Sequence, residues 1–309
     1  MPRKVMWRFA LWQVGRFVLA LVGAGLLAAA VSAFAITGAT QGIAAFSQAF
    51  ASRAAAFGTG HFGYSAIVAQ SSTDLVLKGL APTLTLILWG ALIALIVGAP
   101  LGIVFGRGPA RRALAPLIQI VAATPVFCVG LGLIWLAVHY AHWPASAHGD
   151  AGAALGLLPA ILQRNGGAIA SGFRLLLVPA LIVGASGAAS LQLSLRRAAA
   201  EAGDAPYRQG LKLMGLSTLE IERVYVAPQV IAGVLSNAGE IVLALISAAA
   251  IAEWLFDWPG DAVLFVKSVA LRDWNVAALV LLLFAVIKLI ADLAGALAAR
   301  ALAEPERDA

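Results

Sequence analysis

Long apolar runs separated by short polar segments dominate the chain. Each run holds about 20 or more mostly hydrophobic residues, the length at which a helix crosses roughly 30 Å of hydrocarbon. The alternating strands of about 10 residues that mark a membrane β-barrel are not visible. The pattern predicts an all-α polytopic membrane protein with six transmembrane helices, at about residues 14–36, 80–105, 113–139, 174–195, 229–252 and 274–299.

Prolines and the first apolar run refine these spans. Pro82 is expected in the first turn of the second span, where a residue without an N–H is tolerated. Pro125 is expected to kink the third span. The first run follows a basic segment and so resembles a signal peptide, but its apolar part, 17–36, exceeds the usual core of about 7–15 residues. We therefore interpret it as an uncleaved span.

Composition agrees with the membrane class, since 61% of the residues are hydrophobic and only 12% are charged. The net charge of +6 does not indicate a nucleic-acid partner, because basic residues of membrane proteins mostly set their orientation in the bilayer. Most of the 21 lysines and arginines fall on one side if the N-terminus is cytoplasmic. We therefore expect both termini in the cytoplasm. The single cysteine, Cys128, excludes an internal disulfide.

This orientation leaves two long outer loops, about 37–79 and 140–173, and a polar cytoplasmic segment, about 198–228, which we call the hairpin. The second outer loop contains an apolar stretch, 151–163, that is too short to span a membrane, so an interfacial helix is expected there. No internal repeat or linker divides the chain. A single transmembrane domain, 1–309, is predicted.

The hairpin carries signals for two short helices. Ser217 and Glu220 match a capping box, in which each side chain accepts from a free amide at the helix start. Leu216 and Ile221 can form a hydrophobic staple across the same turn, and Gly215 is placed to end the preceding helix. A solvated loop does not need all of these signals together. We therefore expect a preformed docking element for a cytoplasmic partner.

The spacing from Gln209 to Pro228 resembles the cytoplasmic signature EAA-x3-G-x9-I-x-L-P of ABC-importer permeases. Gly215 and Pro228 match in register, whereas the acidic residue, both alanines, the isoleucine and the leucine differ. Further stretches are similar, in order, to segments of the dipeptide/oligopeptide/nickel permease class: "GHFGYS" (60–65), 81–106, 123–137, "EWLFDWPG" (253–260) and 269–276. A first span joined directly to a long outer loop resembles the first of that class's two paired permeases.

The resemblance implies a type I ABC-importer permease fold in a bacterial inner membrane. It also implies a second permease, two ATP-binding subunits and an extracytoplasmic substrate-binding protein as partners. ATP hydrolysis is expected on the partner chains, because this sequence has no GxxxxGK[ST] phosphate loop. The chain is thus expected to be a transport subunit without catalytic residues or a cofactor. The residues expected to couple to the ATPase are Gly203, Asp204, Tyr207, Gln209, Gly210, Lys212, Gly215, Leu216, Ser217, Glu220 and Pro228.

Charged residues within the spans have two interpretations each. Glu240 in the fifth span is either part of the translocation path, together with Asn237, or a protonated or paired structural acid. Both interpretations stay open. Lys288 and Asp292 are four residues apart on the last span, so an intrahelical ion pair is favoured over a transport site.

The outer ends of the spans hold aromatic and histidine residues. An aromatic belt explains Trp254, Trp258 and Trp274. The rigid turn Trp258-Pro259-Gly260 is also a candidate for an outer gate or a contact with the binding protein. His139, His142 and His148 lack the fixed spacing of metal ligands, so no metal site is predicted.

Other classes fit the sequence less well. An intramembrane enzyme would need a motif such as HExxH or GxSxG within its spans, and a secondary transporter usually has more spans and broken helices at the midplane. A structural membrane subunit without transport activity is the alternative from another class. Peptides or peptide-like molecules are the favoured substrates, with nickel or another small solute as the alternative. The small residues at 184–190 allow either close helix packing or a roomy cavity.

Overall fold

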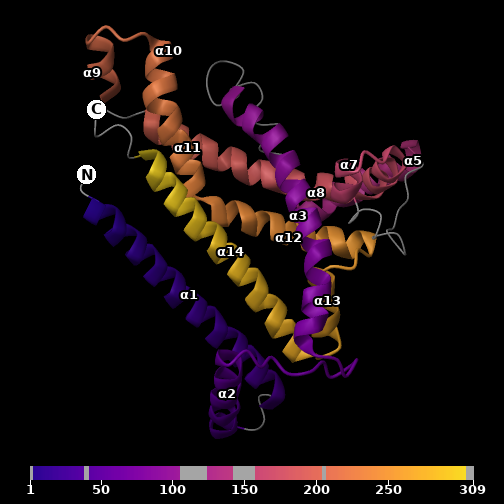
Figure 1. Cartoon of the computed structure of the whole chain (residues 1–309). Helices are drawn as coiled ribbons and strands as arrows, with labels where there is room; N and C mark the ends of the chain where they lie inside the picture. The colour runs from indigo at the N-terminus through magenta and orange to yellow at the C-terminus, as the bar shows by residue number, and fades with distance from the viewer. Residues whose placement is uncertain (1–2, 38–41, 105–123, 142–156, 204–206, 304–309) are drawn as a thin grey trace.

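The computed structural model describes residues 3–37, 42–104, 124–141, 157–203 and 207–303, and these residues form a helical molecule (Figure 1). Extended backbone within them pairs only at an isolated antiparallel bridge between Tyr64 and Ser71. Five helices are long and apolar enough to cross a membrane. They are α1 (Arg3–Thr37), α3 (Ser72–Val104), α8 (Gly166–Gly203), α12 (Ala238–Phe256) and α14 (Trp274–Ala303).

The predicted third span corresponds to a shorter apolar helix, α5 (Val126–Ala141), and 113–123 lies outside the described residues. Pro125 directly precedes α5, and because 113–123 lies outside the described residues, the predicted kink at this proline stays a prediction. The amide of Cys128 donates to the Pro125 carbonyl at 2.9 Å, which places the proline at the start of the first turn.

The remaining helices lie outside the five long spans. The predicted outer loop 37–79 contains α2 (Gly42–Gly58) and the start of α3, and the second outer loop contains α7 (Leu157–Leu162) within its predicted apolar stretch. Because α3 begins at Ser72, Pro82 lies in the helix interior, and its predicted place in the first turn is wrong. Asp74 in the first turn supports this early start, since a negative charge is favourable at a helix N-terminus.

The predicted fifth span is not continuous. The hairpin's second arm runs as α10 (Thr218–Glu220), a π-helical segment η1 (Ile221–Val226) and α11 (Ala227–Ser236), and the chain then changes direction into α12 (Figure 1). Asn237 at the break has φ −104° and ψ 16°, and its side-chain amide donates to the Gly233 carbonyl at 2.9 Å. Asparagine favours such breaks because its side chain competes for backbone hydrogen bonds.

Close approaches of α8 to its neighbours build the core. A Cβ on Gly184 would lie 2.5 Å from Cγ2 of Ile93 on α3, and one on Gly187 would lie 2.5 Å from Cδ2 of Leu245 on α12. The small residues at 184–190 therefore serve close helix packing on this side, as small residues do between membrane helices. The buried side chains Ile182 and Val183 lie in the same core.

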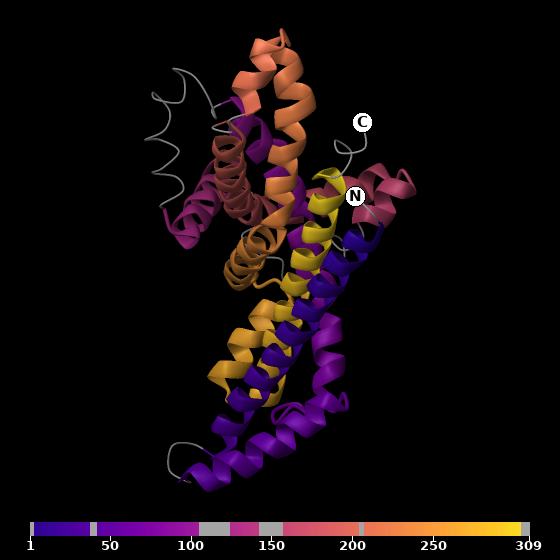
Figure 2. The same cartoon turned by 90° about the vertical axis from the view of Figure 1, so that its left-hand side faces the viewer.

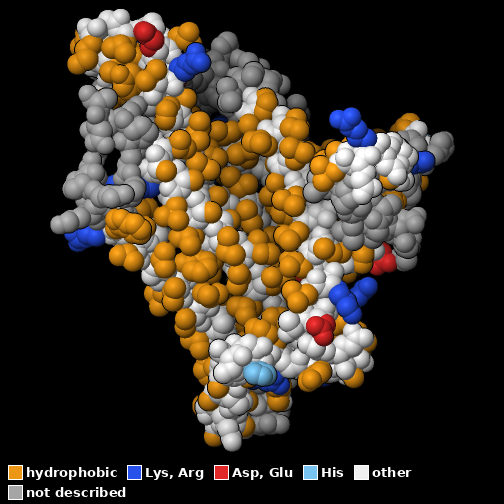
Figure 3. Space-filling model, in the orientation of Figure 1, with side chains coloured by type: hydrophobic (Ala, Val, Ile, Leu, Met, Phe, Trp, Pro, Cys, Tyr) orange, Lys and Arg blue, Asp and Glu red, His pale blue; other side chains and the backbone are white. Residues whose placement is uncertain are grey.

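The outer surface of the bundle is strongly apolar. Figure 3 shows hydrophobic side chains across the middle of one face, with charged side chains toward its margins. Leu19 and Leu88 are among many large apolar side chains that are mostly exposed. A soluble monomer rarely exposes so large an apolar area, so this face suits lipid or a neighbouring membrane subunit.

Replacing Gly98 tests the packing of α3 on α8. A Cβ at this position would lie 2.9 Å from the Ala188 Cα and 3.0 Å from its carbonyl oxygen, and backbone atoms cannot move aside easily. Gly98→Val is expected to lower stability by about 1–3 kcal/mol, measured as a lower melting temperature in detergent. Gly132→Val on α5 is the control, because no atom lies near its Cβ position. Equal melting temperatures for the two variants would contradict this packing.

Candidate functional site

The hairpin projects from the bundle at one end, as Figures 1 and 2 show. Its first arm, α9 (Tyr207–Leu213), ends at Gly215, whose φ of 87° is left-handed. The Gly215 amide donates to the Lys212 carbonyl at 3.1 Å and the Leu216 amide to the Leu211 carbonyl at 3.3 Å. These two bonds form a Schellman motif, which explains why glycine occupies the turn.

The predicted capping box opens the second arm. The Glu220 amide donates to Ser217 Oγ at 3.3 Å, and the Ser217 amide donates back to Glu220 Oε2 at 2.9 Å. The Ser217 amide, and secondly its hydroxyl, holds the pKa of Glu220 below its usual value. Glu220 is therefore ionised at neutral pH and stabilises the helix start.

A small apolar cluster and two polar links fix the base of the hairpin. Ile221 and Val226 are buried together with Ala202 at the end of α8, and Leu216 packs against them, as a hydrophobic staple requires. Arg208 forms an ion pair with Glu222 across the two arms. The Tyr207 hydroxyl donates to Gln229 Oε1 at 3.1 Å.

The tip of the hairpin presents apolar side chains that the sequence analysis did not single out. Leu213 is 90% exposed, Met214 78% and Leu219 75%. Of the predicted coupling residues, Gln209, Lys212, Gly215, Ser217 and Glu220 are exposed, whereas Gly203, Tyr207, Gly210, Leu216 and Pro228 are partly buried, and Asp204 lies outside the described residues. The tip of the hairpin is therefore an exposed apolar surface at one end of the bundle.

Pro228 lies in the first turn of α11, directly after the π-helical segment. The Ala227 amide donates to the Glu222 carbonyl, five residues back, as in a π-helical turn. A proline here has no N–H to donate to the preceding turn, and the π-helical turn directly before it is the kind of local adjustment that accommodates a proline inside a helix. The second arm therefore continues without interruption from Thr218 to Ser236.

Glu240 belongs to an ion network below the hairpin. Lys288 Nζ lies 2.6 Å from Asp292 Oδ2 and 3.3 Å from Glu240 Oε1. The predicted pair on α14 is therefore present, and it extends to α12. Gly239 allows this close approach, since a Cβ there would lie 1.8 Å from Asp292 Oδ1. The Glu240 side chain remains mostly exposed, and with Asn237 it lines a cavity of about 780 Å³ between α1, α11, α12 and α14.

The end of the bundle away from the hairpin is organised by a buried acid, Glu253, that the sequence analysis did not single out. Its side chain is fully buried near the end of α12. Oε1 accepts from the Thr83 hydroxyl of α3 at 2.6 Å, and Oε2 accepts from the amides of Ala262 and Val263 at 2.8 and 2.9 Å. These amides open α13 (Asp261–Ala270), so Glu253 satisfies the start of one helix from the end of another.

The turn Trp258-Pro259-Gly260 packs over this acid. Trp258 is fully buried and its Nε1 donates to the Pro82 carbonyl at 3.1 Å, so this tryptophan belongs to the core rather than to an aromatic belt. A Cβ on Gly260 would lie 2.2 Å from the Glu253 carboxyl. Pro259 is the exposed member of the three. Trp254 is also exposed.

Asp261 is the second buried acid at this end of the bundle. Its amide donates to Thr83 Oγ1 at 2.8 Å, while neither carboxyl oxygen has a hydrogen-bond partner within the described structure. Burial, and secondly the nearby charge of Glu253, raises the pKa of Asp261 to about 7.

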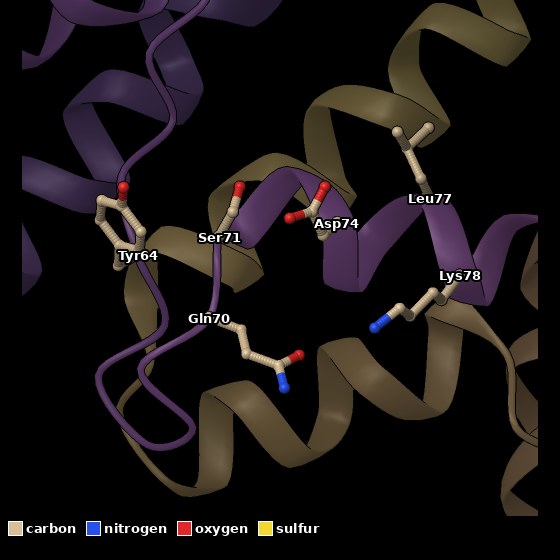
Figure 4. Close-up of a pocket in the computed structure, with 6 residues that line it drawn as sticks. All are labelled: Tyr64, Gln70, Ser71, Asp74, Leu77 and Lys78. Atoms are coloured by element: carbon tan, nitrogen blue, oxygen red, sulfur yellow. The ribbon is translucent and has the colours of Figure 1, made fainter.

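A polar pocket of about 680 Å³ lies beside the first turns of α3 (Figure 4). The predicted outer-loop motif contributes Tyr64, and Figure 4 shows Gln70 and Lys78 extending toward each other across the open space. The motif is tied to the start of α14, because Ser65 Oγ donates to Asp273 and the Asn275 side-chain amide donates to the Tyr64 carbonyl.

The predicted histidine cluster is described only in part. His139 stacks on Trp135 with ring centroids 5.3 Å apart. His142 and His148 lie outside the described residues, so the predicted absence of a metal site stays a prediction.

Comparison with known proteins identifies the architecture. The family described as "Binding-protein-dependent transport system inner membrane component" matches residues 98–304, more than half of the chain. The chain belongs to this family. It is therefore a multi-pass inner-membrane permease of the ABC-importer type, a transport subunit rather than an enzyme, and the resemblance drawn from the sequence is confirmed at this level.

Two relatives narrow the comparison. The permease is 28% identical over 137 residues to a dipeptide transport system permease protein of Haemophilus influenzae, covering 44% of this chain and 41% of that protein. It is 27% identical over 234 residues to a probable D,D-dipeptide transport system permease protein of Escherichia coli K12, covering 68% and 66%. The chain thus spans less than two thirds of either relative's length.

Removing the Glu253 carboxyl tests whether it holds α3, α12 and α13 together. Glu253→Ala leaves the Thr83 hydroxyl and the Ala262 and Val263 amides without their acceptor. Each buried donor without a partner costs about 1–3 kcal/mol, so a strong fall in melting temperature is expected. Glu253→Gln keeps an acceptor oxygen and is expected to be milder. Glu201→Ala on the exposed end of α8 is the control, and a loss no larger than this control would contradict the role of Glu253.

The pH dependence of stability tests the burial of Asp261. Because its pKa is raised in the folded state from 3.8 to about 7, the folded protein binds this proton more tightly than the unfolded chain does. Stability is then expected to rise as the pH falls from about 8 to about 5. Asp261→Asn should weaken this rise, measured as the difference in melting temperature between the two pH values. An unchanged difference in the variant would contradict a raised pKa.

Proposed function

We propose that this permease couples to a cytoplasmic ATPase through the hairpin and forms half of the translocation path for peptides or peptide-like molecules. The observation that carries the coupling role is the exposed apolar tip, Leu213, Met214 and Leu219, on a hairpin fixed by caps and by a buried base. Large apolar side chains in water are unfavourable unless a partner covers them. The partners are two ATP-binding subunits, a second permease and an extracytoplasmic substrate-binding protein.

The continuous second arm supports a mechanical route from the ATPase into the membrane. A push on the tip moves Thr218–Ser236 as one helical rod, and the break at Asn237 is where α12 can change its angle to that rod. The ion network of Lys288 then links the first turn of α12 to α14. ATP-driven closure of the ATPases would shift the equilibrium between inward-open and outward-open arrangements through this route.

The orientation with both termini in the cytoplasm also belongs to this proposal. The first turns of α1, the last turns of α14 and the hairpin lie toward one end of the molecule, whereas α2 and α13 lie toward the other (Figures 1 and 2). This arrangement agrees with the distribution of basic residues in the sequence.

The substrate class rests on the relatives and on one acidic side chain. One relative is described as a dipeptide permease and the other as a probable D,D-dipeptide permease. Glu240 offers a mostly exposed carboxylate beside Asn237, which would attract the ammonium group of a peptide in the path. Nickel or another small solute is the alternative substrate, and a structural subunit without transport is the alternative role.

The outer end is the proposed side for the binding protein and an outer gate. Trp258 and Gly260 are buried, so we propose that they position the turn while exposed Pro259 meets the partner. The polar pocket at Tyr64, Asp74 and Lys78 is a second exposed feature on the first turns of α3.

Charge at the hairpin tip tests the coupling role. Leu213→Asp with Leu219→Asp should leave the permease folded, because both side chains are exposed, yet it should abolish co-purification of the ATPase and ATP-driven uptake. Ile43→Asp with Leu162→Asp makes the same chemical change at equally exposed apolar positions outside the hairpin. Retention of the ATPase by the tip variant would contradict docking at this site and would favour the structural-subunit alternative.

The substrate is tested separately in proteoliposomes that hold the whole transporter and its binding protein. Uptake of labelled dipeptides is expected, and Glu240→Gln should reduce uptake of peptides with a free amino terminus more than of N-acetylated peptides. Uptake of nickel but not of peptides would overturn the peptide proposal while leaving the coupling proposal intact.

A further inference from the structure

Basic and aromatic side chains of α1 and α14 form a row where these two helices pack together. The Arg16 guanidinium lies 4.8 Å from the centroid of the Trp12 ring. The Trp12 and Phe9 ring centroids are 6.5 Å apart, and the Arg300 guanidinium lies 5.4 Å from the Phe9 centroid. Cation–π contacts therefore hold two guanidinium groups on either side of an aromatic pair. Figure 2 shows α1 and α14 side by side along this stretch.

This row of side chains lies at the cavity of about 780 Å³ described above. Phe9, Arg16 and Arg300 line one part of this cavity. An apolar wall continues from them along α1 and α14 toward the middle of the spans, and it consists of Phe17, Ala20, Leu289, Leu293 and Ala296. The part of the cavity lined by α1 and α14 is thus basic and aromatic at the end of the bundle and mostly apolar farther in, where Lys288 and Asp292 are its charged members.

The acids of the cavity do not cancel this basic character. Glu240 and Asp292 both bind Lys288, so two negative charges face a lysine within one network. Arg16 and Arg300 bring two further positive charges to the lining. Counted together, the charged side chains around the cavity are net positive.

We propose that the part of this cavity between α1 and α14 binds an anionic phospholipid of the surrounding leaflet, a role that goes beyond coupling and transport. The phosphate lies at the arginine-lined end of the cavity, where Arg16 and Arg300 attract it from either side of the aromatic pair, and an acyl chain follows the apolar wall. Basic pockets between transmembrane helices recognise anionic headgroups in this way. A lipid fits better than a soluble phosphate because the apolar wall adjoins the arginines. Trp7 and Trp12 on the same stretch of α1 are 65% and 57% exposed, as expected of side chains at a membrane interface.

The test titrates the delipidated full-length chain with dioleoylphosphatidylglycerol and counts bound lipid by native mass spectrometry. Dioleoylphosphatidylcholine, with the same acyl chains and no net charge, is the comparison lipid. Removing both guanidinium charges in the Arg16→Gln, Arg300→Gln variant should weaken phosphatidylglycerol binding about 30-fold, since each basic group near the surface contributes about a fivefold effect. Arg8→Gln with Arg197→Gln removes two charges elsewhere and should leave binding within about threefold.

A second variant keeps the test informative if the double substitution disturbs folding. Ala296→Phe fills the apolar wall and leaves both arginines in place, so it should also displace the lipid. Equal affinity for the two lipids, or equal losses in the arginine variant and its control, would overturn the proposal. So would full competition by inorganic phosphate, which would make this an anion site without a lipid. Loss of the bound lipid on assembly with the second permease would identify the cavity as a protein interface instead.

Discussion

The buried carboxyl of Glu253 is the constraint on which the half of the structure away from the hairpin depends. A carboxyl group without partners in an apolar core is strongly unfavourable, and here it accepts from Thr83 of α3 and from two amides of α13. One side chain on α12 therefore sets the positions of two other helices. The turn above it must then contain glycine at Gly260, because a side chain at that position would overlap the carboxyl.

The half of the structure that carries the hairpin is built on a different principle. Its hairpin is stabilised by local hydrogen bonds, the Schellman turn at Gly215 and the capping box at Ser217, and by a small buried base around Ile221. Such an element keeps its shape while its exposed tip stays free for a partner. Between the two halves, the helix break at Asn237 gives the fifth span a place to bend, and the Lys288 network ties that place to α14.

The sequence predicted the features that depend on near neighbours. The capping box and the glycine turn involve residues within about one helical turn, and so does the Lys288–Asp292 pair. Contacts between segments far apart in the chain were not predicted from the sequence. Thr83 and Glu253 are 170 residues apart, so no local pattern connects them, and Trp258 has the same apolar and aromatic character whether it faces lipid or a core. The break at Asn237 was missed because hydrophobicity alone does not distinguish one long helix from two shorter ones.

Crosslinking from the hairpin tip tests directly whether an ATP-binding subunit docks there. With Cys128 replaced by serine, Leu213→Cys would be the only thiol of the permease, and a short bismaleimide would join it to any thiol within reach on a bound subunit. In membranes that hold the assembled transporter, we expect a crosslinked product containing the ATP-binding subunit from Leu213→Cys and none from the control Ile43→Cys. A product from Ile43→Cys but not from Leu213→Cys would place the ATPase at the opposite end and contradict the account.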